Sequence, residues 1–339
     1  MDLHIDSFTF DARPSYPLLT TAKRYRHASF SPDDPDAYTL VFAHATGAHK
    51  ECWEPVIRYI TQGGTGKVRE VWSVDCPNHG DAAVLNEEEL KVGYEPVFSW
   101  DTQYARVLHR FVTGLGKGIP TDFATHRIIA IGHSMGAVAW LFTRQYHPPP
   151  PFASIILIDP MILGPSFDTA PIGRFLESST LKRRDCWASR EEAFKSLLPR
   201  YRHEEEVMRA YVEHALRDLP TALYPDKQGV TLKCVKTQEL ACYRDAQSSA
   251  LAYTYLKHVC TELPVHFING AVPDYLPLEL KADTVLTASN GKYKSWQEVA
   301  GAGHMVPQMA PKGTAEAILH IVADPEYNQR MPAPQTSKL

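Results

Sequence analysis

Short hydrophobic runs alternate along the chain with longer stretches in which hydrophobic residues recur at helical spacing. This alternation is typical of parallel strands that are joined by crossover helices. The run SIILI at 154–158 is hydrophobic throughout, so we expect it in the middle of a sheet that is covered on both faces. The pattern predicts strands at 38–43, 70–74, 127–131, 154–158, 265–268 and 295–299, and an antiparallel strand at 24–30.

One interval between predicted strands is much longer than the others. About a hundred residues separate 158 from 265, far more than a single crossover helix needs. Amphipathic helices are predicted in this interval at 190–198, 204–219 and 242–259, and the last should return to the core. We interpret the interval as a mainly helical cap that is inserted after the sixth strand. The predicted organisation is a core of residues 1–160 and 260–325, a cap of residues 161–259 and a flexible tail of residues 326–339.

Composition and charge narrow the classes of function. The 339 residues are 44% hydrophobic and 22% charged, with a net charge of −4, which is typical of a soluble globular protein with a sizeable core. The longest basic run is Lys-Arg-Arg at 182–184, so no nucleic-acid partner is expected. We also expect no membrane span and no signal peptide. The six cysteines are scattered, so we expect reduced thiols, no metal site and no cofactor.

The segment RIIAIGHSMGAV at 127–138 carries the strongest chemical signal. A hydrophobic strand runs directly into Gly132-His133-Ser134-Met135-Gly136, and a helix is predicted to follow. This is the G-x-S-x-G motif in the context that it requires, because small residues let the strand and the helix approach around a strained serine turn. We predict that Ser134 is a nucleophile and that the Met135 backbone N–H helps to stabilise an oxyanion. The alternative is a serine that only caps the helix.

A histidine follows the last predicted strand. His304 lies in GAGHMVP at 301–307, whose glycines allow a tight loop and whose proline can open the next helix. Of the 15 histidines, His304 is the one with this setting. We predict that it is the general base that accepts the serine proton. A histidine on a surface loop is the alternative.

Two aspartates compete to orient the imidazole of His304 and to offset its developing positive charge. Asp159 ends the strand at 154–158 in IILIDP, and Asp274 follows the strand at 265–268 in INGAVPDYLP. Either aspartate could instead cap a loop. We favour Asp159, because it stands immediately at the end of its strand, and we keep Asp274 as the alternative acid.

The loop after the first long strand should supply a second oxyanion donor. Its sequence is HATGAHKECWEP, and the backbone N–H of Ala45 or Thr46 is predicted to complete the hole together with Met135. Two residues separate His44 from Gly47 in this loop, which leaves the identity of the donor open. We expect His44 to pack and hydrogen-bond beneath the loop rather than take part in the reaction.

The last three residues are Ser337, Lys338 and Leu339, the tripeptide that peroxisomal import receptors read at a free carboxyl terminus. The residues before it, MPAPQT, are polar and rich in proline, so we expect a flexible tail that leaves the tripeptide accessible. The prediction is a protein of the peroxisomal matrix that binds an import receptor through these three residues.

Several segments between about residues 40 and 310 carry a family resemblance. They are HATGAHKECWEP, DCPNHGDAAVLN, FSWDTQYARVLH, GHSMGA, LIDP and GAGHMVP. Together they resemble an α/β-hydrolase subgroup of fungal secondary-metabolite and toxin pathways, the mycophenolyl-CoA hydrolase-like peroxisomal hydrolases. The resemblance implies the α/β-hydrolase fold, with a mostly parallel central sheet and flanking helices, and a thioesterase or esterase for a bulky acyl compound. In that subgroup the acid follows the serine by the shorter interval, which favours Asp159.

These features predict a serine hydrolase that cleaves an acyl thioester or ester, and the resemblance points to a peroxisomal acyl-CoA thioesterase of fungal secondary metabolism. The partner is then a small acyl substrate. For a CoA thioester the basic run at 182–184 is a candidate phosphate contact, although a solvated run of charge is the simpler interpretation. A carboxylesterase or lipase, an acyltransferase and a catalytically silent binding protein are the alternatives. A homodimer is compatible with the sequence.

Overall fold

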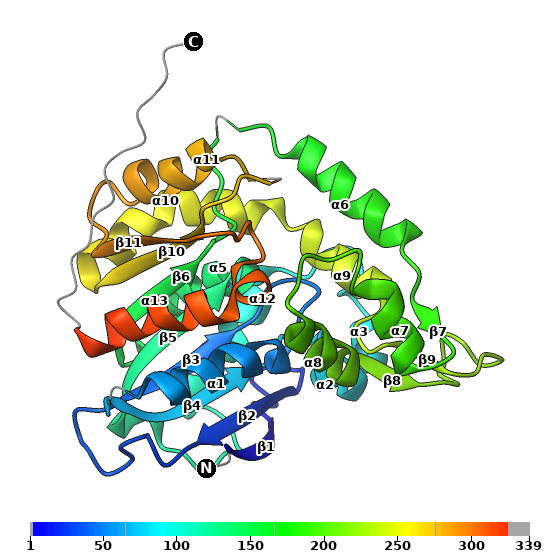
Figure 1. The fold of residues 1–339 in the computed structure, drawn as a ribbon, viewed down its shortest axis with the longest axis horizontal. Coiled ribbons are helices and arrows are strands. Elements are labelled where there is room, and N and C mark those ends of the chain that lie inside the picture. Colours follow the sequence, from blue (N-terminus) through cyan, green and yellow to red (C-terminus); the bar gives the residue numbers. More distant parts are fainter. Residues whose placement is uncertain (1–2, 65, 166, 275, 325–339) are drawn as a thin grey trace.

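The computed structural model describes residues 3–324, apart from residues 65, 166 and 275. In this part of the chain eight strands form one sheet in the order β1-β2-β4-β3-β5-β6-β10-β11 (Figure 1). β2 is antiparallel to both of its neighbours, and the strands from β4 to β11 are parallel. The strands are β1 (His4–Phe10), β2 (Thr20–Arg26), β3 (Tyr38–Ala43), β4 (Val68–Val74), β5 (Arg127–His133), β6 (Phe152–Ile158), β10 (Val265–Gly270) and β11 (Ser295–Val299).

Six predicted strands are confirmed as β3, β4, β5, β6, β10 and β11. The antiparallel strand expected at 24–30 is present as β2, but its predicted bounds are wrong, because it begins at Thr20 and ends at Arg26. The hydrophobic pattern does not predict β1, since most of its side chains are exposed at the sheet edge, where polar residues are tolerated. An ion pair of 2.9 Å between Arg24 and Asp6 joins these two strands.

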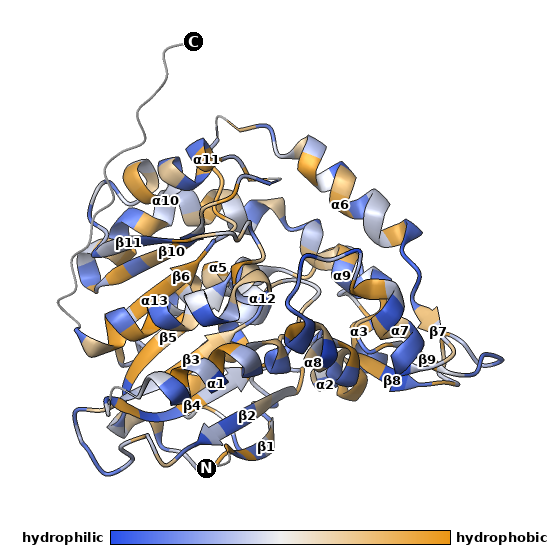
Figure 2. Ribbon diagram, viewed as in Figure 1, coloured by the Kyte–Doolittle hydropathy of each residue, from blue (hydrophilic) through white to orange (hydrophobic). Residues whose placement is uncertain are grey.

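Alternate residues of the central strands point to opposite faces of the sheet and build two hydrophobic cores. On one face, Phe42 and Ile131 pack in a core with α1 and α13. On the other face, Val41 and Ala130 pack with α4, α5 and α10. Figure 2 shows the middle strands β5 and β6 as largely hydrophobic. The helices around the sheet are α1 (Glu54–Gly63), α2 (Gly80–Leu85), α3 (Glu87–Leu90), α4 (Ala105–Val112), α5 (Met135–Phe142), α10 (Ala246–Glu262), α11 (Leu278–Asp283), α12 (Val306–Met309) and α13 (Pro311–Ala323).

Between β6 and β10 the chain leaves the main sheet and forms the region α6–α9. This region contains a small antiparallel sheet in the order β7-β9-β8 and has a hydrophobic core of its own, which includes Trp187, Phe194 and Leu216. Figure 1 shows the region to one side of the main sheet, with α6 along its outer edge. Its elements are α6 (Ala170–Lys182), β7 (Cys186–Trp187), α7 (Arg190–Leu197), α8 (Glu205–Ala215), β8 (Leu216–Asp218), β9 (Val230–Leu232) and α9 (Lys236–Tyr243).

Two of the three helices predicted between β6 and β10 need correction. The helix at 190–198 is confirmed as α7, but the helix expected at 204–219 ends at Ala215, because the next three residues pair with β9. The helix expected at 242–259 is divided between α9 and α10, since the Asp245 side chain accepts a hydrogen bond from the Ser248 N–H and caps a new helix there. α6 is not predicted, because Pro171 and Gly173 obscure its helical pattern.

Candidate active site

Ser134 lies in a sharp turn between β5 and α5. Its backbone has φ 54° and ψ −115°, a conformation that residues other than glycine rarely adopt. A Cβ atom on Gly132 would lie 2.5 Å from the backbone of α5, and one on Gly136 would lie 2.5 Å from the carbonyl oxygen of Ala43. Both glycines are therefore required by the close approach of the strands and the helix. The turn places Ser134 at the carboxyl end of the parallel strands, where it lines a cavity.

His304 follows β11 and faces Ser134. Its Nε2 atom lies 3.0 Å from the Ser134 Oγ atom, and its side chain is buried. Two contacts hold the backbone of this residue: the His133 ring donates from Nε2 to the His304 carbonyl oxygen (2.8 Å), and the His304 N–H donates to Asp274 Oδ2 (2.5 Å). Burial lowers the pKa of His133 to about 3, so that ring is neutral around pH 7 and supports the loop without adding charge.

Asp159 follows β6 and lies beside the imidazole of His304. Its Oδ1 atom is 4.0 Å from His304 Nδ1, an ion-pair separation that is longer than a hydrogen bond. Burial raises the pKa of Asp159, but His304 and Lys281 lower it by more, so the net pKa lies below its usual value. The carboxylate accepts hydrogen bonds from Lys281 Nζ (2.8 Å), Asn269 Nδ2 (3.2 Å) and the Gly270 N–H (3.3 Å). Lys281 is absent from the predicted site, because a single lysine in a helix gives no signal in the sequence.

Asp274 is an exposed residue after β10. Its Oδ2 atom accepts the hydrogen bond from the His304 N–H, and its Oδ1 atom accepts one from the Leu276 N–H at 3.1 Å. A Cβ atom on Gly303 would lie 2.4 Å from Asp274 Oδ2, so the loop passes directly against this carboxylate. The two aspartates are thus placed differently: Asp159 lies against the ring of His304, whereas Asp274 holds its backbone.

The loop after β3 brings Ala45 and Thr46 to the same cavity as Ser134. Thr46 Oγ1 donates to Met135 Sδ at 3.4 Å, and Met135 begins α5, so its backbone N–H belongs to the helix N-terminus. His44 supports this loop from below: its Nδ1 contacts the Ala45 carbonyl oxygen at 2.8 Å, and its Nε2 accepts from the Cys76 N–H at 2.9 Å. Burial lowers the pKa of His44 to about 4, so this ring is neutral around pH 7 and supports the loop without adding charge.

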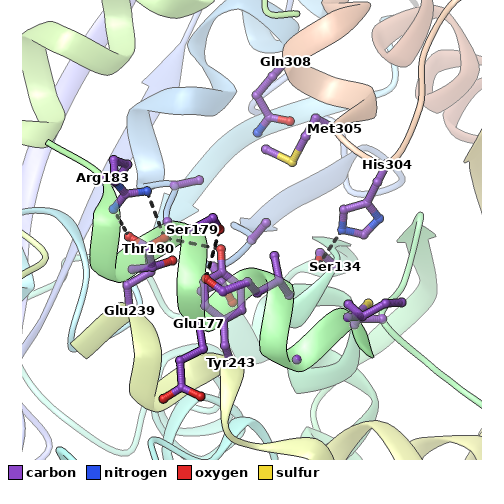
Figure 3. A pocket seen from close by; sticks show the side chains of 18 of the residues that line it. Ser134, Glu177, Ser179, Thr180, Arg183, Glu239, Tyr243, His304, Met305 and Gln308 are labelled. Atoms are coloured by element: carbon purple, nitrogen blue, oxygen red, sulfur yellow. Dashed lines mark hydrogen bonds and ion pairs between the residues drawn. The ribbon is translucent and has the colours of Figure 1, made fainter. Parts of the chain in front are cut away.

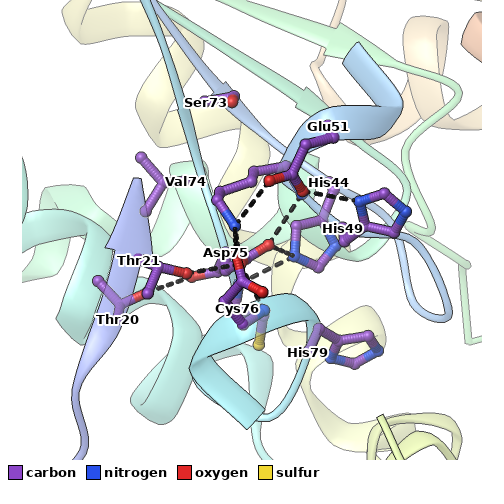
Figure 4. A network of polar contacts seen from close by, with 12 residues as sticks. Thr20, Thr21, His44, His49, Glu51, Ser73, Val74, Asp75, Cys76 and His79 are labelled. Carbon is purple, nitrogen blue, oxygen red and sulfur yellow. Dashed lines mark hydrogen bonds and ion pairs between the residues drawn. The ribbon is translucent and has the colours of Figure 1, made fainter. Parts of the chain in front are cut away.

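A buried polar network holds the far end of this loop (Figure 4). The carboxylate of Asp75, directly after β4, accepts hydrogen bonds from the Lys50 N–H and from Lys50 Nζ, both at 2.8 Å. Thr21 Oγ1 donates to the same carboxylate at 2.6 Å, and Glu51 pairs with Lys50 Nζ at 2.9 Å. Asp75 therefore ties the loop to β2 and β4. Its role could not be predicted, because its partners are distant in the sequence.

Ser134 and His304 open on a cavity of about 810 Å³ between the main sheet and the region α6–α9 (Figure 3). Most of the surface that lines this cavity is apolar. A cavity of this size can enclose a substrate considerably larger than a short ester. Its hydrophobic lining includes Met161, Leu163, Ile172, Leu176, Val207 and Met208.

The basic residues at 182–184 do not act as one unit. Arg183 forms a two-pronged ion pair with Glu239 of α9 in the wall of the cavity. Arg184 is exposed and pairs with Glu192 at 2.8 Å. The expectation of a solvated run is therefore wrong for Arg183, whose charge is offset by a buried carboxylate.

Among residues 3–324, without the three gaps, no group of three or more histidine, cysteine, aspartate or glutamate side chains could hold a metal ion. Within the same described ranges, no helix combines the length and the hydrophobicity that crossing a bilayer demands.

The serine turn, the facing histidine and the parallel sheet define a family. Residues 40–317 match the model of the alpha/beta hydrolase family, and the chain belongs to that family. A type I acyl-CoA thioesterase of Penicillium brevicompactum, mpaH, is 28% identical to this chain over 217 residues. That match covers 63% of this chain and 48% of the thioesterase, so the chain spans about half the length of this curated relative.

A second relative matches over more of its length. A protein of Saccharomyces cerevisiae named peroxisomal membrane protein LPX1 is 25% identical over 327 residues, which are 90% of this chain and 79% of that protein. The crystal structure of the peroxisomal α/β-hydrolase Lpx1 from the same yeast superposes with a TM-score of 0.72 at 21% identity, covering 99% of this chain and 93% of that one.

Other solved structures share the fold. The E-2-(acetamidomethylene)succinate hydrolase has a TM-score of 0.69 at 18% identity, covering 94% of this chain and 99% of that chain. The thioesterase domain from the curacin biosynthetic pathway has a TM-score of 0.63 at 14% identity, with the same coverage. At these identities the similarity establishes the α/β-hydrolase fold alone.

Proposed function

We propose that the protein is a serine hydrolase that cleaves acyl thioesters, with Ser134 as the nucleophile and His304 as the general base. The observation that carries the proposal is the 3.0 Å contact between Ser134 Oγ and His304 Nε2 in the wall of a largely apolar cavity. A serine hydroxyl is a weak nucleophile by itself, so a base within hydrogen-bond distance is the requirement for catalysis.

The proposed reaction proceeds in two steps through an acyl-enzyme. Ser134 Oγ attacks the acyl carbonyl carbon while His304 Nε2 accepts the hydroxyl proton, and the same nitrogen then returns the proton to the leaving thiolate. Water deprotonated by His304 releases the acid in the second step. We assign Asp159 as the residue that orients His304 and offsets its positive charge, because its carboxylate lies 4.0 Å from Nδ1 while Asp274 contacts the backbone.

The developing oxyanion requires donors on the side of the carbonyl away from His304. We propose the backbone N–H of Met135 as one donor, because it stands at the N-terminus of α5 directly after the nucleophile. Ala45 or Thr46 is the second, since both line the cavity with Ser134 on a loop that His44 holds in place.

The proposed substrate is an acyl thioester with a bulky hydrophobic acyl group, as in a CoA thioester. Three relatives named type I acyl-CoA thioesterase support this class, and the cavity is large and mostly apolar. We further propose that the region α6–α9 acts as a cap domain that encloses the acyl group, because it supplies much of the cavity wall.

We also propose that the protein acts in the peroxisome. Ser337, Lys338 and Leu339 lie outside the described residues, so support comes from the tripeptide itself and from the peroxisomal relative. A fluorescent protein fused to the N-terminus should colocalise with a peroxisomal marker, and deletion of Leu339 should leave the fusion in the cytosol. Unchanged localisation after the deletion would contradict a role for the tripeptide.

The activity is tested by thiol release from a panel of acyl-CoA thioesters and by acid release from ethyl esters of the same acids. The enzyme should hydrolyse thioesters, Ser134→Ala should abolish turnover, and Ser179→Ala should retain it, because that cavity-lining serine belongs to α6 and hydrogen-bonds the Leu176 carbonyl oxygen rather than Ser134 or His304. If only the oxygen esters are hydrolysed, and only when Ser134 is present, the proposed activity becomes that of a carboxylesterase instead of a thioesterase. If the enzyme hydrolyses none of these thioesters and esters, the proposed hydrolase activity is contradicted.

A further inference from the structure

Two polar side chains line the cavity without hydrogen-bond partners in the described part of the chain. Gln308 of α12 is 3% exposed, and its Oε1 atom is buried and unpartnered. His203, in the segment before α8, has both ring nitrogens buried and unpartnered. The Glu204 N–H donates to the Gln308 carbonyl oxygen at 2.9 Å, so the two residues belong to neighbouring parts of one wall.

Buried polar atoms without partners are unfavourable for folding, so native proteins rarely contain them without a functional reason. Gln308 lies on the same wall as Met305 and His304, and its side chain is directed toward the cavity (Figure 3). Apolar side chains surround much of the remaining cavity. A polar group of the substrate is therefore the expected partner, and ordered water is the competing explanation.

The chemistry of the two side chains defines the partner. A carboxamide offers both a donor and an acceptor, and a neutral imidazole offers one of each. Burial lowers the pKa of His203 to about 4, so its ring is neutral around pH 7. Neither residue brings a positive charge for a phosphate or a carboxylate. A secondary amide, which has one N–H and one C=O, matches this pair.

The position of Gln308 indicates which part of the substrate it meets. It lies in α12, four residues after His304, the residue that returns a proton to the leaving atom in the proposed reaction. The leaving group must therefore start beside His304, on the wall that also carries Gln308. Building on the proposed thioesterase activity, we propose that Gln308 and His203 form a subsite that hydrogen-bonds a secondary amide in the thiol leaving group.

The test compares two thioesters of one fatty acid, an N-acetylcysteamine thioester, which carries the amide, and a pentanethiol thioester, which does not. Gln308→Met and His203→Phe remove the polar atoms with side chains of similar size, and Ser179→Ala is the matched cavity-lining control. Each polar-to-apolar variant should lower kcat/KM for the amide thioester by about three- to tenfold and leave the alkyl thioester within about twofold. Ser179→Ala should leave the ratio of the two substrates unchanged.

Thermal unfolding separates this role from a structural one, because removing an unpartnered carboxamide should not lower the Tm of Gln308→Met. If the ratio of kcat/KM for the amide thioester to kcat/KM for the alkyl thioester stays at its wild-type value in both variants, the subsite is overturned. The two side chains would then hydrogen-bond ordered water, and the thioesterase proposal would stand. Failure of the unmodified enzyme to hydrolyse either thioester would overturn both proposals.

Discussion

The Nε2 atom of His304 lies 3.0 Å from the Oγ atom of Ser134, although 170 residues separate them in the chain. The contact arises because β5 and β11 are parallel members of one sheet, so the loops that follow them emerge at the same edge. The strained turn at Ser134 and the hydrogen bond from His133 to the His304 carbonyl oxygen fix both partners before any substrate binds.

The different positions of Asp159 and Asp274 predict different effects of removing their charges. Asp159→Asn should lower kcat by roughly 10³-fold or more, because the imidazole loses the anion beside its Nδ1 atom. Asp274→Asn should stay within about tenfold of the wild type, since an amide oxygen can still accept the His304 N–H. Steady-state thiol release measures both. A larger loss in the Asp274 variant, at equal thermal stability, would reverse the assignment.

Much of the site can be predicted from local sequence, and the remainder depends on tertiary contacts. Ser134 is recognisable because the strand, the glycines and the helix that its turn requires are adjacent in the chain. Asp159 and Asp274 follow neighbouring strands, so the sequence alone leaves two candidates. Gln308 and His203 give no local signal, because only the folded chain shows that their polar atoms are buried without partners.

The same distinction applies to the fold. The central strands are predicted well, since burial on both faces makes them continuously hydrophobic. The helix expected through 216–218 is wrong because pairing with β9 overrides the helical pattern, and α6 is not predicted because Pro171 and Gly173 obscure its pattern, although it packs against α9 in the folded chain. Contacts between distant segments decide these elements.

Lys281 is the buried cation beside Asp159, and its removal should destabilise the fold. Lys281→Met should lower the free energy of unfolding by about 3 kcal/mol, because the buried Asp159 carboxylate then loses its 2.8 Å partner. Lys292→Met is the exposed control and should change stability by less than about 0.5 kcal/mol. Urea unfolding of the two variants at pH 7 measures the difference. Equal stabilities would show that Asp159 does not depend on this cation.

Arg183 and Arg184 are adjacent arginines with different surroundings. Arg183→Met should lower the free energy of unfolding by about 3 kcal/mol, because Glu239 remains as an uncompensated charge in the cavity wall. Arg184→Met should cost about 0.5 kcal/mol or less, since its pair with Glu192 is exposed. The double variant Arg183→Met/Glu239→Leu should recover part of the loss. No recovery would contradict the pairing.

Buried neutral histidines should make the protein sensitive to mild acid. Burial lowers the pKa of His266 to about 4, so from pH 6.5 down to that value the unfolded chain binds a proton that the folded chain does not. The contribution of the neutral His266 ring to the free energy of unfolding is therefore present in full above pH 6.5 and is lost as the pH falls toward 4. Between pH 7 and pH 5 this residue should account for about 2 kcal/mol of the decrease in the free energy of unfolding. The measurement is the decrease in the wild type and in His266→Met, which should be smaller in the variant. An identical loss in both proteins would contradict the shift.

Covalent labelling of Ser134 tests the central claim most directly. An alkyl fluorophosphonate reacts with a serine hydroxyl that a neighbouring base activates, and peptide mass spectrometry then identifies the modified residue. The reagent should modify Ser134 in the unaltered protein, and His304→Ala should slow the labelling by several orders of magnitude while retaining the fold. Absence of modification at Ser134, or a rate that is indifferent to His304, would contradict the proposed nucleophile and base.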